Sequence, residues 1–592
     1  MHDSSKPTTE HHHSPPQGFL WTHVFSLDHK VIGKQYYFLS LAAVLIGMVL
    51  SWLVRFHLAW ASAAIPGLQY LSKVGAPGGI ITPEYYLSLL TLHGTLMVFF
   101  VLTTAPQAGF GNYFLPIQIG AEDMAFPRLN MLSFWVTFVG FVVLISTLFV
   151  SDGPPISGWT AYAPLSAIGT DAGPGLGTGQ VLWVISIGFF CIGSLLGALN
   201  FIATTLDLRA KGMTLARMPY TTWAWFITAV LALLAFAVLL PACVLLALDH
   251  LGGTSFFIPG GLVVSDKLQP HSGGSTLLWQ HMFWFFGHPE VYIAIIPGLG
   301  ITSHILTATA RKDILGGTRV LVGCMVSIAF LSFMVWGHHM FISGMNPFSS
   351  LVFSVPTLII TIPASIVTLN WIGTVFGARL RLHTPGLFAI GFISVFVTGG
   401  LSGFFLAQPS LDIYLHATYF VVGHFHMVMG VAAIFGMFAG TYFWFPKMFG
   451  RMMSETLGKI HFWVTFIGVY CIFMPMHYLG LAGNVRRYSA FVDDYLAPLI
   501  PVHKFITIAA FVTGAAQLLF LFNLFWSMYR GKKAEENPWQ ATTLEWTVPS
   551  PPPFDNFGGR HPVVYRGPYE FAVEETKDDF VMQDSPQQPA RS

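Results

Sequence analysis

Long apolar stretches separated by short polar ones fill the chain between residues 34 and 528. Most of them reach the roughly 20 residues that a helix needs to cross the hydrocarbon core of a membrane. The pattern therefore predicts an all-α integral membrane protein, a bundle of twelve transmembrane helices. The predicted spans are 34–55, 84–118, 131–150, 178–206, 221–248, 276–307, 319–340, 350–377, 384–407, 416–446, 458–479 and 502–528.

The flanking sequence is different in character. Residues 1–24 form a polar N-terminal tail, and residues 531–592 a polar, Pro-rich tail for which we expect irregular structure. The twelve-helix domain is expected between them, over residues 25–530. No cleavable signal peptide precedes the first span, which we expect to stay in place.

Composition supports this interpretation and excludes some functions. Hydrophobic residues make up 54% of the 592 residues and charged residues only 9%, roughly a third of the soluble average. A formal net charge of +1 gives no reason to expect nucleic acid as a partner. Four cysteines lie within apolar stretches without a CxxC pair, so neither disulfides nor thiolate metal sites are predicted.

Twelve spans place both termini on one side, and the positive residues indicate which side. Seventeen Lys and Arg fall on the side of the termini and six on the other. This bias predicts that both termini face the inside of the membrane. The six outer residues are Arg55, Lys73, Lys267, Arg486, Arg487 and Lys504.

Six histidines from four predicted helices fall at a similar depth in the outer half of the bilayer, when depth is measured at 1.5 Å per residue. They are His93, His288, His338, His339, His424 and His426. A lone histidine inside a membrane more often bonds a carbonyl or pairs structurally than binds a metal, and His281, His304 and His477 are interpreted in that way. Six in one layer instead favour cofactor binding.

The spacing of these histidines predicts how they are shared. His424 and His426 point roughly 200° apart on a helix, so they can serve two cofactors on opposite sides of it. His338, His339 and His288 could form a three-imidazole site, which suits copper. His93 would then supply an axial ligand facing the helix of His426. The count fits two haems and one copper.

The stretch "GHPEVY" at 287–292 adds proton chemistry. Tyr292 lies one helical turn after His288, where a phenol can donate a proton and an electron to a substrate at the metal. Glu290 points away from His288 near mid-membrane, where a carboxyl is functional by default. Pro289 removes one backbone hydrogen bond and loosens the helix. Ordinary packing for Tyr292, or a structural hydrogen bond for Glu290, is the alternative.

Four motifs together resemble subunit I of haem–copper oxygen reductases, close to the aa3-type cytochrome c oxidases. They are "WQHMFWFFGHPEVY", "VWGHHMF", "HFH" and "GNYFLPIQIGAEDMAFPRLN", and the resemblance covers about residues 25–530. It implies a twelve-helix subunit that reduces O2 to water and pumps protons. It also implies a bacterial plasma (inner) membrane, with both termini cytoplasmic.

The resemblance assigns the cofactor ligands. His93 and His426 would bind a low-spin haem, His424 a high-spin haem, and His288 with its two partners the copper. It further implies a cross-link between His288 and Tyr292. Arg55 matches an arginine near the haem formyl group, a hint of haem A, and Arg486 and Arg487 match arginines that bind the propionates.

The resemblance also implies a proton route from the inside to Glu290. Asp123, in the loop after the second span, would be the inlet, although a capping or interfacial charge is the alternative. The polar lining would come from Asn112, Asn130, Ser194 and Asn200.

Two departures from the family pattern concern proton and metal sites. Ala364 and Val367 replace the threonine and lysine of the family's second proton path. We hypothesise instead that a hydroxyl stripe leads past Ser303 towards Tyr292; hydroxyls bonding their own helix are an equal alternative. The stripe comprises Thr357, Thr361, Ser365 and Thr368.

The second departure is Ala417, which stands where the family has an aspartate beside the histidine of a magnesium site. His416 remains as a possible outer metal ligand, but magnesium is not expected there.

The function expected from this resemblance is the catalytic subunit of a terminal oxidase that takes electrons from cytochrome c. The chain has no dicopper motif, so electrons must come through a partner, by resemblance a subunit II with a dicopper centre, alongside subunit III. A quinol-oxidising relative is the nearest alternative, and a transporter without redox cofactors is the alternative from another class.

Overall fold

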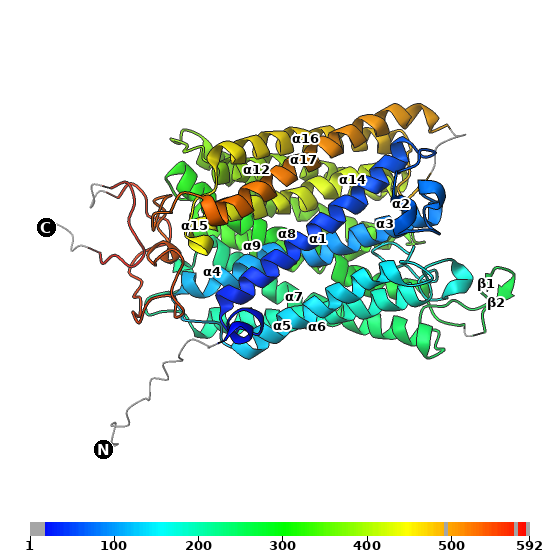
Figure 1. Cartoon of the computed structure of the whole chain (residues 1–592), viewed down its shortest axis with the longest axis horizontal. Coiled ribbons are helices and arrows are strands. Elements are labelled where there is room, and N and C mark those ends of the chain that lie inside the picture. Colours follow the sequence, from blue (N-terminus) through cyan, green and yellow to red (C-terminus); the bar gives the residue numbers. More distant parts are fainter. Residues whose placement is uncertain (1–17, 271, 490–494, 574–577, 588–592) are drawn as a thin grey trace, which may run out of the picture.

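The computed structural model describes residues 18–270, 272–489, 495–573 and 578–587, and in this part of the chain it is a bundle of long helices (Figure 1). Part of the predicted N-terminal tail, residues 1–17, lies outside the described residues. The long uninterrupted helices are α1 (His29–Ala59), α5 (Pro127–Ser146), α6 (Thr178–Asp207), α7 (Tyr220–Leu251), α8 (Thr276–Ala310), α12 (Thr384–Leu406), α16 (Glu455–Leu481) and α17 (Ile500–Arg530).

Three further spans are built from consecutive helical pieces. The second span consists of α3 (Pro83–Thr95), the π-helical η3 (Leu96–Leu102) and η4 (Thr104–Gly109), and α4 (Phe110–Ile119). The eighth consists of α10 (Pro347–Ile359) and α11 (Thr361–Val375). The tenth consists of α14 (Tyr419–Phe425), the π-helical η9 (His426–Val431) and α15 (Ala432–Phe449).

Eleven helices in the described residues are long and apolar enough to cross a membrane. The remaining predicted span, 319–340, is shorter than expected: α9 (Gly317–Ser332) has 16 residues, and the 3-10 turn η8 (Trp336–Met340) follows it. The all-α fold class is therefore confirmed, and all twelve predicted spans correspond to helical segments.

Short elements connect the spans. They are the helices α2 (Leu68–Leu71) and α13 (Pro409–Leu415), the π-helical η1 (Leu20–Val24), and the 3-10 turns η2 (Pro77–Gly79), η5 (Thr147–Phe149), η6 (Thr170–Ala172), η7 (Leu215–Arg217), η10 (Ala497–Leu499) and η11 (Leu544–Trp546). A two-stranded antiparallel hairpin, β1 (Val263–Val264) and β2 (Lys267–Leu268), projects from one end of the bundle (Figure 1).

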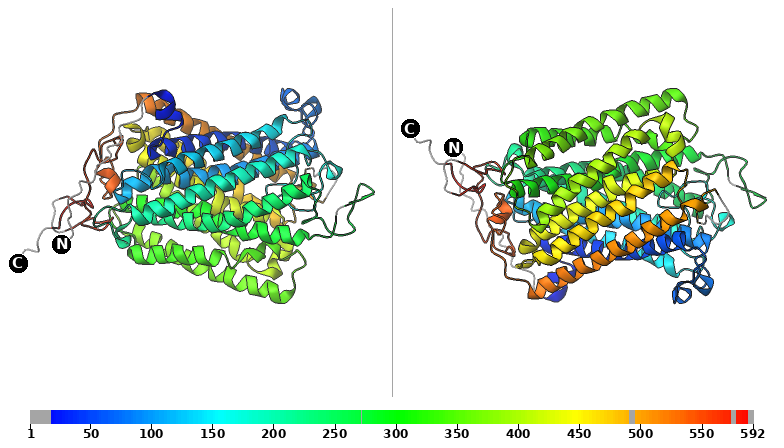
Figure 2. Two further views of the ribbon diagram at one scale, coloured as in Figure 1. Left: turned by 90° about the horizontal axis from the view of Figure 1, so that it is seen from below. Right: turned by 90° about the horizontal axis from the view of Figure 1, so that it is seen from above.

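Helix α8 forms the centre of the bundle. It packs against α7, α9, α12 and α15, and most of its side chains are buried, which fits a helix that is apolar on every side. Pro289 and Pro297 lie inside it, and each lacks the N–H that would bond the carbonyl one turn earlier. The "GHPEVY" stretch is thus placed in the core. Figure 2 shows the surrounding helices running side by side.

The π-helical segments follow two of the predicted haem ligands. Segment η3 begins three residues after His93, and η9 begins at His426 itself. A π-helical turn widens the helix and is enriched at functional sites. It changes the direction of the side chains that follow, which a regular helical spacing does not predict.

The C-terminal segment after α17 crosses one end of the bundle, the end at which α1 begins (Figures 1 and 2). It has little regular structure, as expected, but several of its residues are buried. Glu545 is fully buried, and its Oε1 lies 3.0 Å from Nε2 of His304 on α8. Tyr569 packs beside them, with its hydroxyl 2.9 Å from Nδ1 of His304. The segment is therefore part of the folded core at this end.

Candidate functional site

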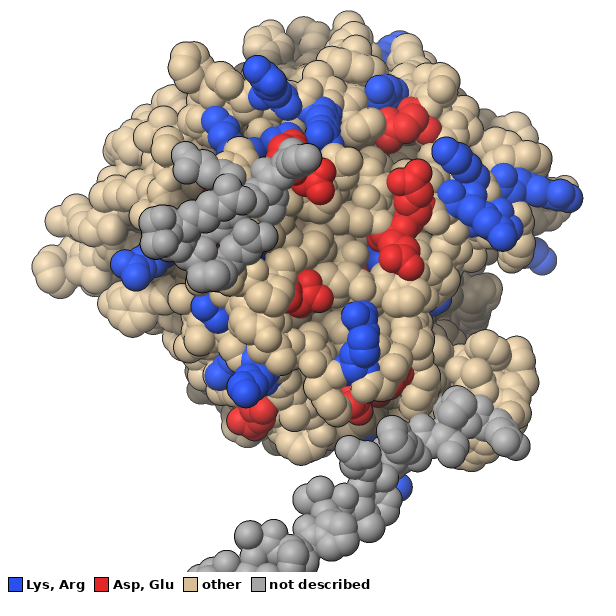
Figure 3. Space-filling view, turned by 90° about the vertical axis from the view of Figure 1, so that its left-hand side faces the viewer, with Lys and Arg blue, Asp and Glu red and all other residues tan. Residues whose placement is uncertain are grey.

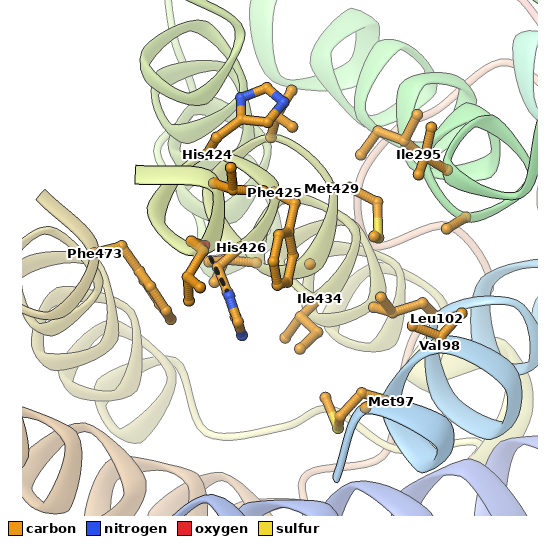
Figure 4. Close-up of a pocket in the computed structure, with 18 of the residues that line it drawn as sticks. Met97, Val98, Leu102, Ile295, His424, Phe425, His426, Met429, Ile434 and Phe473 are labelled. Carbon is orange, nitrogen blue, oxygen red and sulfur yellow. Dashed lines mark hydrogen bonds between the residues drawn. The ribbon is translucent and has the colours of Figure 1, made fainter. Parts of the chain in front are cut away.

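All six histidines of the predicted layer line one central cavity of about 1070 Å³. They come from α3, α8, η8, α14 and η9, so the bundle gathers residues that lie far apart in the chain. Tyr292, Glu290 and Arg55 line the same cavity, as do Arg486 and Arg487. Figure 4 shows part of its wall, which is largely apolar apart from the imidazoles.

Three imidazoles converge at one side of the cavity. Ligand nitrogens of His288, His338 and His339 all lie within 4.8 Å of one another. Nδ1 of His288 is 3.2 Å from Nε2 of His339, while Nε2 of His288 is buried and has no hydrogen-bond partner among the residues that the structure describes. Among the described residues, no other group of three potential ligands is this close. The arrangement offers three neutral nitrogen donors to one metal ion.

Two neighbouring residues hold this cluster in place. Oγ1 of Thr357 on α10 lies 3.0 Å from Nδ1 of His338. The indole of Trp284 stacks on His339 at 3.7 Å between ring centroids and 11° between planes. The indole N–H of Trp284 in turn donates to the hydroxyl of Tyr162 at 2.5 Å. Sequence reasoning placed Thr357 only in the hydroxyl stripe and missed Trp284, although Trp284 is one turn before His288.

The other three histidines share a single feature. In each, Nδ1 lies close to a backbone carbonyl oxygen: Gly47 for His93 at 2.9 Å, Gly399 for His424 at 2.8 Å, and Val422 for His426 at 2.9 Å. A carbonyl can only accept, so Nδ1 carries the proton and Nε2 keeps its lone pair. This second contact fixes the ring and its tautomer, as is usual for metal-binding histidines.

His93 and His426 form a pair across the cavity. Their rings are nearly parallel, at 11°, with centroids 6.4 Å apart. His424 leaves the same helical segment as His426 but in a different direction (Figure 4). The geometry therefore agrees with the expectation that the two histidines of "HFH" face different sites. Phe473 stacks on His426 at 4.8 Å.

Tyr292 and Glu290 lie on the same helix as His288. The rings of Tyr292 and His288 are 5.1 Å apart, so the phenol is next to the three-imidazole cluster. Glu290 is 2% exposed; its Oε1 accepts a 2.6 Å hydrogen bond from Thr103, and its Oε2 has no partner in the described part of the chain. A buried carboxyl with one free oxygen is able to take up or release a proton.

A small cavity of about 50 Å³ lies beside Thr103, the hydrogen-bond partner of Glu290. Asn112 and Ser194 line it. The volume is enough for water, since one molecule needs about 10–15 Å³ in this measure. Deeper along the predicted route, Oδ1 of Asn112, both amide atoms of Asn130 and Nδ2 of Asn200 are buried without partners within the described residues. Such atoms are typical contacts of ordered water.

Asp123 lies at the far end of this line, in the loop between α4 and α5. Its side chain is half-buried, and Oδ1 accepts a 2.6 Å hydrogen bond from the backbone N–H of Met124. Burial raises the pKa of Asp123 to about 7, so this carboxyl exchanges protons close to neutral pH.

Buried arginines border another part of the cavity. Nη2 of Arg55 donates to the carbonyl of His503 at 3.0 Å, but Nε and Nη1 are buried without partners in the described structure. Arg486 lies in the loop after α16, where burial and the neighbouring Arg487 lower its pKa to about 10. Arg487 reaches Thr160 at 3.4 Å. Such donors suit carbonyl or carboxylate acceptors.

Near these arginines, Asp412 lies 3.0 Å from Nδ1 of His416, one turn later in the chain. Ala417 follows with φ +57° and supplies only its carbonyl, which accepts from the backbone N–H of Arg486 at 2.8 Å. The position where the family has an aspartate thus carries no side-chain oxygen.

The hydroxyl stripe lies on the cavity side of α10 and α11. All four of its members line the same cavity as Tyr292, whereas Val367 is fully buried elsewhere. Thr357 and Thr368 also bond carbonyls of their own helix, at 2.6 and 3.0 Å. Ser303 does not line the cavity; its hydroxyl donates to Leu299 at 2.7 Å and accepts from Trp371 at 2.9 Å.

Fold and site together define a polytopic membrane protein with a histidine-lined central cavity. The sequence pattern of the family described as "Cytochrome C and Quinol oxidase polypeptide I" matches residues 31–512. The chain belongs to this family. It is therefore a subunit of a membrane oxidoreductase that acts on O2, and the family resemblance inferred from the motifs is confirmed. Membership excludes the transporter alternative.

Relatives match along almost the whole chain. The alternative cytochrome c oxidase subunit 1 of Bradyrhizobium diazoefficiens is 46% identical over 586 residues, which cover 98% of this chain and 95% of the relative. The cytochrome c oxidase subunit 1 of a Synechocystis species is 42% identical over 562 residues, covering 94% and 95%. The fold also matches a cryo-EM structure of a heme–copper terminal oxidase dimer, with a TM-score of 0.67, 16% identity, and coverage of 86% and 85% of the two chains.

Proposed function

We propose that the chain is the catalytic subunit of a terminal respiratory oxidase that reduces O2 to water with electrons from cytochrome c and couples this to proton translocation. The observation that carries the proposal is the convergence of six imidazoles from separate elements on one cavity, with Tyr292 and Glu290 beside them. The names of the two relatives described above support cytochrome c as the donor.

The donor set fits two haems and one copper ion. His93 and His426 present free Nε2 atoms across the cavity and would hold the low-spin haem, and His424 would hold the high-spin haem. His288, His338 and His339 would hold copper, for which imidazole is a preferred ligand. Nε2 of His288 is buried and has no partner among the described residues, which supports a metal there.

When bound, the haems and the copper carry electrons to O2, and one O2 with four electrons and four protons gives two water molecules. The protein's part is to deliver protons and exclude water. Tyr292, next to the His288 cluster, is placed to donate its phenolic proton, and the family resemblance implies its cross-link to His288. Glu290 holds the next proton, because an isolated carboxyl in an apolar interior favours its neutral form.

We assign proton entry to Asp123. From there, Asn130, Asn200, Asn112 and Ser194 would order water as far as the Thr103–Glu290 pair. Thr103 keeps Oε1 of Glu290 fixed, so Oε2 is the atom able to exchange its proton.

The hydroxyl stripe is the proposed second route, to Tyr292. Pro363 cannot donate a backbone hydrogen bond, and a single residue, Ile360, lies between α10 and α11. Thr357 and Thr361 both line the cavity wall. Thr361 and Ser365 make no hydrogen bond to their own helix in the described contacts and are the members best placed to bond water. Ser303 stays a predicted waypoint, beside Trp371 and outside the cavity wall.

Arg55, Arg486 and Arg487 would hold the polar edges of the haems. The unpartnered donors of Arg55 suit a formyl oxygen, which supports haem A, and the two outer arginines suit propionates. His416 pairs with Asp412, but Ala417 supplies no carboxylate beside it. We therefore propose no magnesium ion there.

The distribution of charged residues supports an orientation of the bundle in the membrane. The basic residues assigned to the inside by the positive-inside bias lie at the end of the bundle that carries the C-terminal segment, where Figure 3 shows Lys and Arg around Asp and Glu. We therefore place this end in the cytoplasm of a bacterium, with the bundle in the inner membrane. Subunit II with a dicopper centre, subunit III and a c-type cytochrome are the proposed protein partners.

The donor is tested on the purified complex with an oxygen electrode. Reduced cytochrome c and a ubiquinol are supplied in separate experiments, and the O2 consumption with each donor is compared. The same measurements with added cyanide are the control for uptake that does not come from the oxidase. We expect uptake with cytochrome c only. Uptake with the quinol alone would select the quinol oxidase, the other activity named in the family description.

A further inference from the structure

The side chain of Asn556, in the C-terminal segment, lies where this segment meets the start of α1 and the loop that carries Asp123. Asn556 is fully buried and adopts φ +65°, a left-handed conformation that asparagine and glycine tolerate best. No motif in the sequence marks this residue, because the contacts that define it join positions more than 400 residues apart.

Asn556 uses both ends of its amide. Nδ2 donates to the carbonyls of Ala121 and Glu122 at 2.9 and 3.1 Å, the two residues directly before Asp123. Oδ1 accepts from Nζ of Lys30 at 3.0 Å, and Nδ2 also lies 2.9 Å from Nε2 of His29, which accepts because Nδ1 of that ring faces a carbonyl. One buried side chain therefore ties the Asp123 loop to the first turn of α1.

The same contacts reach the predicted proton route. Nδ1 of His29 lies 2.7 Å from the carbonyl of Asn112, a residue that lines the small cavity beside Thr103. Lys30 also pairs with Asp28 at 3.0 Å and donates to the carbonyl of Phe554. Without the amide of Asn556, two loop carbonyls and a buried ammonium group would each lose a hydrogen-bond partner, at a cost to the order of the loop.

We propose that Asn556 is a positioning residue for Asp123, so that the C-terminal segment sets the geometry of the proton inlet. The inference rests on the proposed role of Asp123. Its consequence follows from solvation: the groups that face Asp123 are Asp28, Lys30 and His29, and burial is the largest influence on its carboxyl. A loosened loop would hydrate Asp123 and lower its pKa from about 7 towards the ordinary value.

The test replaces Asn556 by glycine, which removes the amide but accepts the same backbone conformation. Asn537→Ala is the matched control, because the side-chain bonds of Asn537 to described residues stay within the C-terminal segment, to Ala541 and Met582. Asp123→Asn is the reference for a blocked inlet. Each variant complex is purified with its normal haem content, and turnover is measured from pH 6 to pH 9.

We expect Asn556→Gly to move the alkaline decline of turnover to lower pH by about one unit or more. A pKa lower by one unit leaves about tenfold less protonated Asp123 at pH 8, with a similar loss of turnover there. Asn537→Ala should keep the wild-type profile.

A wild-type profile for Asn556→Gly, together with a strong loss in Asp123→Asn, would overturn the positioning role and leave the inlet intact. Reduced stability of Asn556→Gly with an unmoved profile would show a structural role only, and would also overturn it. Full turnover in Asp123→Asn at every pH would show that Asp123 is not the proton inlet, and would also overturn the proposed role of Asn556.

Discussion

Oγ1 of Thr357 lies 3.0 Å from Nδ1 of His338, so a hydroxyl on α10 holds an imidazole of the three-histidine cluster. Thr357 also donates to the carbonyl of Phe353 at 2.6 Å, which leaves its oxygen lone pairs for the N–H of the ring. The contact fixes which nitrogen of His338 stays free for a metal.

Thr357→Val should therefore weaken copper binding about 10- to 100-fold, the usual effect of removing the partner of a metal-binding histidine. Thr357→Ser keeps the hydroxyl and should restore binding. The copper content of subunit I and its O2 turnover measure the effect. Equal copper retention by the valine and serine variants after dialysis against a chelator would contradict it.

Glu290→Gln should lower turnover by about 10²-fold or more, because an amide cannot relay a proton. Glu290→Asp keeps a carboxyl and should retain more activity than the glutamine variant. O2 uptake is measured with the haem spectrum as the control for assembly. A glutamine variant as active as wild type would exclude Glu290 from proton delivery.

Asp123→Asn should lower turnover by a similar factor of about 10². Burial places the pKa of Asp123 at about 7, above its ordinary value, so the carboxyl carries its proton below pH 7 and loses it above. The wild-type profile should therefore decline through pH 7 to 8. The residual turnover of the asparagine variant should not change between pH 7 and 8. A decline that persists in this variant would show that another group causes it.

Replacing both Thr361 and Ser365 by alanine should slow turnover several-fold, because these hydroxyls would bond the water that leads to Tyr292. Ser327→Ala is the matched control, since Ser327 is an exposed hydroxyl on α9 that bonds its own helix. Steady-state O2 uptake compares the three proteins. Unchanged turnover in the double variant would remove the proposed second route.

Glu545→Ala should lower the free energy of unfolding by about 3 to 5 kcal/mol, because it removes the carboxylate that faces the buried Nε2 atoms of His304 and Gln118. Asp579→Asn is the comparison. Asp579 pairs with Arg311 but is 46% exposed on its side chain, so its loss should cost about 0 to 1 kcal/mol. Thermal denaturation, followed by haem release, measures the stability of both variants. Equal stability of the two variants would contradict a stabilising role of the buried Glu545 contacts.

The sequence predicted the helices well because long apolar stretches leave the backbone no alternative in lipid. The predicted span 178–206, for example, corresponds to α6 at Thr178–Asp207. The exception is the seventh span, where His338 and His339 lie on a 3-10 turn beyond a 16-residue helix. The short helix is followed by a Gly-containing segment that the apolar pattern did not separate from it.

The sequence predicted those features of the candidate site that follow from the depth of a residue in the membrane and from helical periodicity. The layer of histidines followed from residue counting, and the structure brings all six to one cavity. The contacts that fix them did not follow, because the carbonyls of Gly47 and Gly399 are set by how neighbouring helices pack. The same is true of the C-terminal segment. Its polar, Pro-rich composition predicted an irregular tail, and nothing local predicts that Glu545 is buried against α8.

The most direct measurement of the central claim is the haem and copper content of the purified chain, with a pyridine haemochrome assay and a reduced-minus-oxidised spectrum. The account predicts two haems for each chain and one copper in subunit I, with one haem lost in His424→Leu and the other in His93→Leu. A colourless protein without iron or copper, or variants that keep both haems, would contradict it.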